Sequence, residues 1–409
     1  MENALSHLTV LDLSRVLAGP WAGQVLADLG ADVIKIERPQ RGDDTRSWGP
    51  PFLRDVNGDE APGADAAYYL CANRNKKSMT VDFTTPAGRS IVQRLALDAD
   101  IVLENFKVGG LQPYGLDYES LKAINPRLIY CSITGFGQTG PYAARPGYDF
   151  LVQAMGGLMS ITGRGAGEAG AGPQKAGVAV TDILTGLYAA IGVLAAVAHR
   201  QRTGVGQFID LALLDVQVAC LANQAMNYLV SGEPPQRLGN AHPNIVPYQD
   251  FPTSDGYLII AVGNDTQFAR LCTALQIEEV ARDPRFATNQ NRVQHRAVLI
   301  ERLCAATRTQ STAHWVEVLE WAAVPCGPIN TLDAVFADPQ VRSRGMQIAM
   351  PHPTSGTVAL VANPLRLSQT PVSYRNAPPL LGAQTADVLA ERLSMSVEEI
   401  AKLRADGVI

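Results

Sequence analysis

Strand-like and helix-like segments alternate over the first 135 residues, and this alternation constrains the fold more than any other feature of the sequence. Runs rich in β-branched and other apolar residues occupy residues 8–13, 32–37, 78–83, 101–104 and 128–133. Between them, Pro20 stands in the first turn of one helical segment, and Thr85-Pro86 begins another that ends near Asp98. Strands that alternate with helices in this way form a parallel sheet with right-handed crossovers. We therefore predict a large, doubly wound, Rossmann-like α/β domain.

The second half of the chain has a different character. After a strand at residues 208–212 and a helix to about Val230, the segment Ser231–Pro235 has the composition of a linker. Beyond it, one strand-like run precedes several helical segments, which is typical of a small α+β domain. The strand is expected at residues 257–262, and the helices near 266–275, 292–308 and 312–322.

The C-terminal part is expected to be irregular over residues 347–382 and then to form two short helices. The last of these helices begins with a capping box, Ser396–Glu399. A length of 409 residues allows two or three domains, and the pattern fits one sheet domain interrupted by a smaller one. The predicted parts are residues 1–205 as the large, ligand-binding α/β domain, 206–235 as a linker helix region, 236–335 as the small α+β domain, and 336–409 as a return linker with C-terminal helices that pack on the large domain.

Composition disfavours polyanionic partners. The chain has 34 Lys and Arg residues against 39 Asp and Glu residues, a formal net charge of −5, so no nucleic acid or membrane surface is expected as a partner. The longest apolar stretch, Ile183–Ala198, is shorter than the ~18 residues of a membrane span and is predicted to be a buried helix. No targeting signal is visible, and the six cysteines lack metal-ligand spacing. We expect a cytoplasmic protein with reduced thiols and no metal.

Common nucleotide and hydrolase motifs are absent. The chain has no P-loop, no G-x-S-x-G elbow and no H-E-x-x-H helix. The turn Arg15–Pro20, after the first predicted strand, lacks the dinucleotide fingerprint. A G-x-G-x-x-G pattern does occur at Gly165–Gly170, but it lies in a glycine-rich run with no helix behind it. A nicotinamide dinucleotide is therefore disfavoured as a cofactor.

Asp182 is the carboxylate that stands out. It is the only Asp or Glu between Ala171 and Arg200, and it lies where apolar sequence turns into a helix. One interpretation is a helix N-cap, because an aspartate there accepts hydrogen bonds from free backbone N–H groups. The other is a carboxylate nucleophile whose anion is stabilised by the helix N-terminus. The two interpretations are compatible.

Several other polar residues are candidates because they follow predicted strands, at the edge of the sheet where ligands bind. Arg38 follows the second strand and Asn105–Lys107 follow the fourth. Tyr148 lies beside Asp149, where it either packs on the sheet or orients a ligand carbonyl. Each of these residues, taken alone, is equally compatible with a solvated or packing role, so only the group as a whole indicates a binding site.

Taken together, a series of segments in a fixed order resembles family III CoA-transferases of the CaiB/BaiF type. This group includes formyl-CoA transferase and, as relatives, the α-methylacyl-CoA racemases. The resemblance covers nearly the whole chain. The segments that carry it are Val10–Leu13, Val16–Pro20, Leu29–Arg38, Asn73–Ser78, Val81-Asp82, Glu104–Phe106, Gly135–Pro141, Arg145–Asp149 and Thr203–Gln207.

The resemblance implies roles for particular residues. Asp182 occupies the position of the family's catalytic aspartate. Tyr148 stands where racemases carry a histidine, and a phenol of pKa ~10 does not shuttle an α-proton at neutral pH as an imidazole of pKa ~6.5 does. The residues expected to line the site for CoA are Val16, Leu17, Ala18, Arg38, Val81, Asn105, Phe106, Lys107, Tyr148 and Asp149.

The resemblance also bears on the substrate. Leu17 stands where formyl-CoA transferase has a catalytic glutamine, and Pro113 stands where it has an arginine that contacts CoA. Both differences disfavour formate and oxalate. The stretch Arg237–Tyr248 resembles the branch of the family that uses dicarboxylic acids such as succinate and glutarate.

The function that this resemblance predicts is transfer of CoA from an acyl-CoA donor to a free carboxylic acid through aspartyl anhydride and aspartyl-CoA thioester intermediates. Coenzyme A and acyl-CoA are substrates, no cofactor is expected to be bound permanently, and the family's assembly is a homodimer of interlocked rings. The alternatives are a 2-methylacyl-CoA racemase and a non-catalytic acyl-CoA-binding protein, with a nicotinamide-dependent dehydrogenase last.

Overall fold

The computed structural model describes residues 3–60 and 63–409. Contacts divide the chain into two compact units: the first comprises Met1–Gly157, Ala176–Ala225 and Pro339–Ile409, and the second comprises Leu158–Lys175 and Met226–Asp338. These units differ from the predicted boundaries at several places, and residues 226–235 and 336–338, predicted as linkers, belong to the second unit. The glycine-rich residues 158–175 belong to the second unit rather than to the large domain. Residues 206–225 belong to the first unit, because β6 completes its sheet there.

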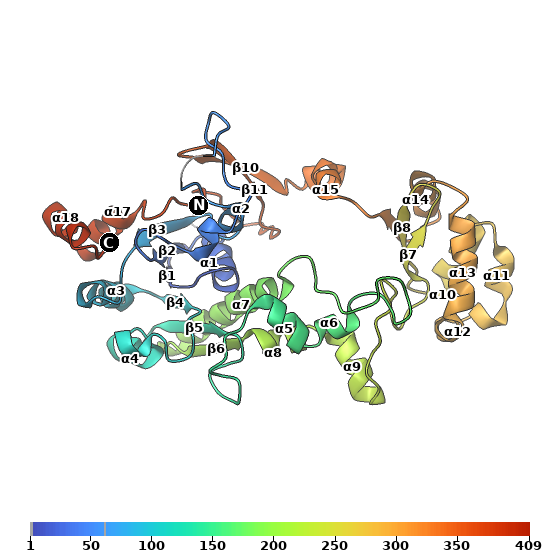
Figure 1. Ribbon diagram of the computed structural model, residues 1–409, viewed down its shortest axis with the longest axis horizontal. Coiled ribbons are helices and arrows are strands. Elements are labelled where there is room, and N and C mark those ends of the chain that lie inside the picture. The colour runs from blue at the N-terminus through green and yellow to red at the C-terminus, as the bar shows by residue number, and fades with distance from the viewer. Residues whose placement is uncertain (1–2, 61–62) are drawn as a thin grey trace. The chain divides into compact units, whose positions relative to one another are not determined.

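The first unit is built on a six-stranded sheet, and every neighbouring pair of its strands is parallel (Figure 1). The predicted α/β fold class is confirmed. The strand order β3-β2-β1-β4-β5-β6 reverses direction after β1, so the switch point of the doubly wound sheet lies between β1 and β4. The strands are β1 (Thr9–Asp12), β2 (Asp32–Glu37), β3 (Lys76–Thr80), β4 (Ile101–Glu104), β5 (Ile129–Thr134) and β6 (Phe208–Ala212).

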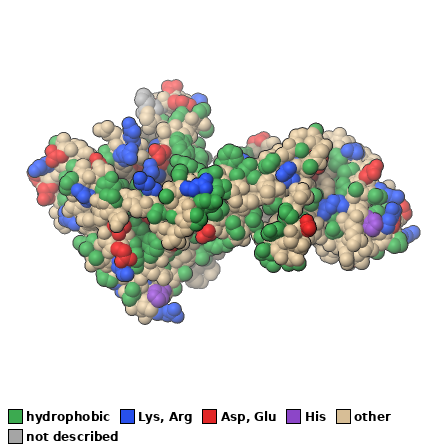
Figure 2. All heavy atoms as spheres, turned by 60° about the horizontal axis from the view of Figure 1, so that its bottom comes forward, with side chains coloured by type: hydrophobic (Ala, Val, Ile, Leu, Met, Phe, Trp, Pro, Cys, Tyr) green, Lys and Arg blue, Asp and Glu red, His purple; other side chains and the backbone are tan. Residues whose placement is uncertain are grey.

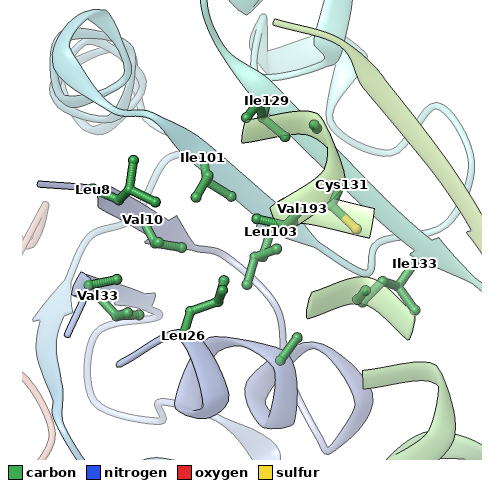
Figure 3. Packing of buried hydrophobic residues seen from close by; sticks show 14 of the residues in the cluster. Leu8, Val10, Leu26, Val33, Ile101, Leu103, Ile129, Cys131, Ile133 and Val193 are labelled. Carbon is green, nitrogen blue, oxygen red and sulfur yellow. The ribbon is translucent and has the colours of Figure 1, made fainter. Parts of the chain in front are cut away.

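Alternate residues of the central strands supply two separate cores. Val10 and Ile101 face a core formed with α1 (Ala18–Asp28) and α7 (Val180–Thr203), in which Leu26 and Val193 pack (Figure 3). Their neighbours Leu11 and Val102 face the opposite core, formed with α3 (Pro86–Asp98) and α4 (Tyr118–Ile124). This two-sided burial explains why the strands read as continuous apolar runs.

Helix α7 is longer than its apolar centre suggested. It spans 24 residues and contains an 18-residue window with a mean hydropathy of 1.8, so by length and composition alone it could cross a membrane. One face of it is nevertheless part of the core through Ala189, Val193 and Ala196. Gly186 lets α7 approach α1 closely, because a Cβ atom there would lie 2.6 Å from the carbonyl oxygen of Ala18. The N-termini of both helices are thereby set against each other.

The second unit has an antiparallel sheet, in the order β7-β8-β9, packed against helices. Leu258, Ile260 and Leu303 are among its fully buried residues. The helix expected at residues 292–308 is broken at His295, whose backbone leaves helical geometry between two shorter helices. The elements are β7 (Tyr248–Pro252), β8 (Tyr257–Ala261), α10 (Asp265–Ala274), α11 (Glu278–Arg282), α12 (Asn289–Gln294), α13 (Arg296–Thr307), α14 (Thr312–Trp321) and β9 (Cys326–Pro328).

The C-terminal segment returns to the first unit. Its stretch 347–382 is not wholly irregular as expected, because β10 (Gln347–His352) and β11 (Gly356–Val361) form an antiparallel hairpin. Pro351 within the first strand and the alternate exposure of both strands concealed this hairpin. Helices α17 (Thr385–Leu393) and α18 (Val397–Ala405) follow and pack on the α3 side of the sheet. The capping box of Ser396 and Glu399 is confirmed.

Candidate active site

A cavity of about 230 Å³ lies at the carboxyl ends of β1, β4 and β5. Asp182 and Tyr148 line it, and so do residues that follow these three strands. This is the place where ligands bind in doubly wound sheets, because the switch point leaves a crevice there. We call it the inner cavity. Of the residues predicted to form the site, it brings together Val16, Leu17, Ala18, Asn105, Phe106, Lys107, Tyr148 and Asp182.

Asp182 is in the first turn of α7 but does not cap it. The N-cap residue is Ala179, and Asp182 is the third helical residue, so the N-cap interpretation is wrong. Among the described residues, none donates a hydrogen bond to its carboxylate. Burial, followed by the charge of Asp149, raises the pKa of Asp182 to about 7. A buried carboxylate without hydrogen-bond donors is less stabilised as an anion than one in water, which favours its use as a nucleophile.

Asp149 caps the N-terminus of α7, because the N-cap residue Ala179 has no side chain that could accept a hydrogen bond. It begins α5 (Asp149–Met155), and its Oδ2 atom accepts the backbone N–H groups of Thr181 at 2.8 Å and Asp182 at 3.2 Å. Its Oδ1 atom accepts the side-chain amide of the fully buried Gln153 at 2.6 Å. Asp149 is absent from the walls of the inner cavity. Asp149 thus lies next to Asp182 but outside the walls of the inner cavity, although it was expected to line the site.

The loop between β1 and α1 forms the wall of the inner cavity with the most constrained backbone. Asn105 holds Arg15 from both sides, accepting its N–H at 2.9 Å and donating to its carbonyl at 2.7 Å. The next residue, Val16, has a φ of 70°, which is unfavourable for a β-branched side chain. The Asp43 carboxylate accepts the N–H of Val16 at 3.2 Å. The surrounding contacts therefore over-determine a strained conformation at the cavity wall.

A second cavity of about 250 Å³ contains the two predicted residues that the inner cavity lacks, Arg38 and Val81. We call it the outer cavity. Arg15, Phe106 and Lys107 line both cavities, so the two share a wall. In its lining the ring of Phe83 contacts the rings of Phe106 and Tyr114 edge to face.

Three cations of the outer cavity are available to a ligand. Arg38, Arg41 and Lys107 line it and are exposed, and within residues 3–60 and 63–409 none of them forms a salt bridge. Figure 2 shows that basic side chains on the face it presents occur in small separate groups rather than as a continuous surface. Phosphate groups would therefore be met by a few placed residues, as the net negative charge predicts.

Tyr148 reaches the inner cavity through a close approach of two backbone segments. Gly135, after β5, contacts Gly147, and a Cβ atom on Gly147 would lie 2.3 Å from the Cα atom of Gly135. Only glycine at both positions allows this distance. The contact sets the path of the chain that carries Tyr148 and Asp149. Tyr148 itself is 64% exposed, so it is a surface wall of the cavity and not a core aromatic residue.

We predict that Gly147→Ala lowers CoA transfer by about 10²-fold, because the two segments must separate by more than 1 Å and carry Tyr148 and Asp149 with them. The measurement is kcat/KM for transfer, with circular dichroism as a check of folding. Gly177→Ala is the matched control, since a Cβ atom there meets nothing within 4 Å. Equal rates for the Gly147→Ala enzyme and the wild type would contradict this role of the glycine contact.

Two residues, one in the wall of the inner cavity and one near Asp182, were not singled out by the sequence. Arg145 lines it, and its guanidinium lies 4.6 Å from the ring centre of Tyr142. Tyr68, on α2 (Ala67–Leu70), lies within electrostatic reach of Asp182, since burial and then that charge raise its pKa to about 12. Arg145 belongs to the segment that carries the family resemblance, which is the one signal that pointed to it. Tyr68 lies in the long loop after β2 and had no signal.

Comparisons with known proteins identify the family of this chain. The family model for "CoA-transferase family III" matches residues 5–385. A succinate–glutarate CoA-transferase of Agrobacterium fabrum is 54% identical over 387 residues, which cover 95% of each chain. A succinyl-CoA:glutarate CoA-transferase of Mus musculus is 46% identical and covers 99% of this chain and 90% of its own length. A crystal structure of a CaiB/BaiF family protein from Brucella suis superposes with a TM-score of 0.84 at 53% identity, covering 96% of this chain and all of the other.

A parallel sheet with a carboxylate in a crevice at its switch point is typical of α/β proteins that bind a ligand there. The matches make the assignment specific: the chain belongs to CoA-transferase family III.

Proposed function

We propose that this enzyme transfers CoA between succinyl-CoA and a second dicarboxylic acid such as glutarate, with Asp182 as the nucleophile. The observation that carries the proposal is the position of Asp182, a carboxylate without hydrogen-bond donors in the wall of the inner cavity. The names of the Agrobacterium fabrum and Mus musculus relatives support the pair of acids. The exposed cation Arg145 in the same cavity supplies positive charge that a free carboxylate acceptor needs.

The two cavities suit the two ends of a CoA thioester. In the proposed binding mode, the outer cavity holds the nucleotide part, with Arg38, Arg41 and Lys107 at its phosphates and the aromatic cluster at its base. The shared wall of Phe106 and Lys107 lies along the pantetheine arm. The thioester then enters the inner cavity beside Asp182 and Tyr148.

The proposed reaction keeps the energy of the thioester through covalent intermediates. An Asp182 oxygen attacks the thioester carbonyl carbon, the carbon–sulfur bond breaks, and an acyl-aspartyl anhydride and CoA thiolate form. The thiolate attacks the aspartyl carbonyl, releasing the first acid and leaving an aspartyl-CoA thioester. The acceptor carboxylate attacks this thioester and forms a second anhydride. CoA thiolate then attacks the acceptor's carbonyl and restores the Asp182 carboxylate.

The experiment that tests this function is a matrix of acyl-CoA donors and free acids, read by mass spectrometry. Succinyl-CoA with glutarate is expected to give glutaryl-CoA and succinate, while acetate and formate as acceptors give at least about tenfold less product. Hydroxylamine is expected to trap acyl groups on Asp182 when donor is present without acceptor. The proposal would be overturned by α-deuterium incorporation without CoA transfer, which is racemase behaviour, or by CoA binding without any acyl-enzyme.

We further propose that the enzyme works as a homodimer in the cytoplasm with no permanently bound cofactor. Large apolar side chains on α7, including Leu187, Tyr188 and Ile191, are exposed in the single chain, which supports burial against a second copy. Light scattering is expected to give twice the 43.8 kDa mass of the chain. A monomer mass over a wide concentration range would contradict the dimer.

A further inference from the structure

Two carboxylates lie together at the N-terminus of α7, and only one of them lines the cavity. Asp182 is in the wall, while Asp149 stands behind it and accepts the N–H groups of Thr181 and Asp182 itself. A neutral acceptor would also satisfy both N–H groups, although less strongly than a carboxylate does. Because Asp149 is a carboxylate and Asp182 beside it is a half-buried carboxylate, two like charges lie side by side. Such an arrangement calls for a role beyond capping.

The position of Asp149 is fixed by a buried network. Gln153 donates to Asp149 Oδ1 at 2.6 Å, and its own carbonyl oxygen accepts the N–H of Ala176 at 2.9 Å. Thr181, which is fully buried, donates its hydroxyl to Gln217 at 2.6 Å. The segment before α7, α5 and α8 (Leu213–Ala219) are thus tied together around the two carboxylates. These hydrogen bonds therefore hold the Asp149 carboxylate in place when Asp182 becomes ionised.

We propose that Asp149 is a positioning residue that also drives acylation, because its fixed negative charge disfavours the ionised Asp182 and so favours the neutral anhydride and thioester forms of that side chain. This inference rests on the proposed function of Asp182 as nucleophile. In the first step the negative charge leaves the Asp182 oxygen and appears on the CoA sulfur as the carbon–sulfur bond breaks. Charge therefore moves from the carboxylate closest to Asp149 to the leaving group, and the repulsion is relieved.

The other charged and titratable groups around Asp182 do not take over this role. Tyr68 on α2 and Tyr148 before α5 carry phenols, and the pKa of Tyr68 is raised to about 12, so it is neutral at physiological pH. The cations Arg15, Lys107 and Arg145 line the cavity, and a positive charge does not raise the pKa of a carboxylate. Besides burial, Asp149 is the one group that raises the Asp182 pKa, which is about 7.

The test is the pH dependence of kcat/KM for Asp149→Asn. In the wild type, activity falls as pH drops through about 7, because the nucleophile is lost when Asp182 takes up a proton. Asparagine keeps an oxygen that accepts both backbone N–H groups but removes the charge. The acid limb is expected to move to lower pH by about one unit, and less acyl-enzyme is expected to be trapped by hydroxylamine at saturating donor. A cap with no electrostatic role would lower the rate at every pH and leave the limb in place.

Asp117→Asn is the matched control. Asp117 caps α4 in the same way, accepting the N–H of Ser120 at 3.3 Å, and it is not in the inner cavity. This variant is expected to keep the limb of the wild type. If Asp149→Asn does not fold, Asp149→Ser, which also places a common capping residue there, gives the same comparison without the charge.

The outcomes separate this inference from the proposed function. A wild-type enzyme that forms no acyl-enzyme refutes the proposed function. The role of Asp149 alone is refuted if the wild-type enzyme forms the acyl-enzyme but the acid limb of Asp149→Asn stays within about 0.2 pH units of the wild type. The expected shift of about one unit corresponds to ~1.4 kcal/mol.

Discussion

The Asp182→Ala enzyme is expected to lose CoA transfer by roughly 10³-fold or more while keeping its fold and its affinity for CoA. In the proposed mechanism Asp182 forms two covalent intermediates, and removal of such a group costs at least ~4 kcal/mol of transition-state stabilisation. The cations and aromatic rings of the outer cavity do not contact Asp182, so they continue to bind the nucleotide part of CoA. The measurements are kcat/KM for transfer and the dissociation constant of CoA from calorimetry.

Asp215→Ala is the control for this substitution. Asp215 is the third residue of α8, as Asp182 is of α7, but it is exposed and lies outside the inner cavity. Loss of an acidic residue from a helix N-terminus costs only ~0.3–1 kcal/mol of stability, so this variant is expected to transfer CoA at a rate close to that of the wild type. Transfer by Asp182→Ala at more than a tenth of the wild-type rate would refute the assignment of the nucleophile.

The sheet could be predicted from the sequence because its strands are buried on both faces. β2 and β4 have the bounds expected of them, Asp32–Glu37 and Ile101–Glu104, since both are apolar runs between clear breaks. β3 was expected two residues too late. Its first residue, Lys76, is fully buried because it forms an ion pair with Asp12 of β1. The sequence around a lysine does not show that a distant residue will pair with it, so Lys76 was not assigned to a buried strand.

The sequence predicted which residues form the candidate site better than it predicted how they are arranged. Asp182 was singled out because it is an isolated carboxylate in apolar sequence, but its position in the helix was not evident, because the cap comes from Asp149, 33 residues earlier. The division of the predicted CoA residues between two cavities depends on how the loops after β2 and β4 fold back. Tyr68 lies near Asp182 through a long loop whose path no periodic pattern indicates.

The Asp12→Asn variant is expected to lose ~3–5 kcal/mol of stability, since it leaves a charged lysine buried without its partner. Asp12 ends β1 and Lys76 begins β3; both are fully buried, and their oxygen and nitrogen lie 2.9 Å apart. Burial opposes the charge of Asp12, but Lys76 and Lys35 outweigh it and lower its pKa. Burial lowers the pKa of Lys76 to about 8 against the effect of Asp12. The Lys76 ammonium also donates to the carbonyl of Pro20 in α1, at 2.8 Å.

Chemical denaturation of Asp12→Asn, Lys76→Met and the double variant tests this expectation. Asparagine keeps the oxygen that accepts the N–H of Ser14, so the lost charge is the main change. The double variant is expected to be more stable than Asp12→Asn alone, because methionine removes the unpaired charge and keeps most of the volume. The deficit of Asp12→Asn should shrink as pH rises towards 8, because loss of Asp12 moves the pKa of Lys76 below its wild-type value of about 8 and the buried lysine becomes neutral there; in Lys76→Met no such recovery is expected. Two results together would contradict this expectation: a stability loss in the double variant equal to the sum of the two single losses, and a loss in Asp12→Asn that does not change with pH. They would show that the charges of Asp12 and Lys76 do not hold β1, β3 and the start of α1 together.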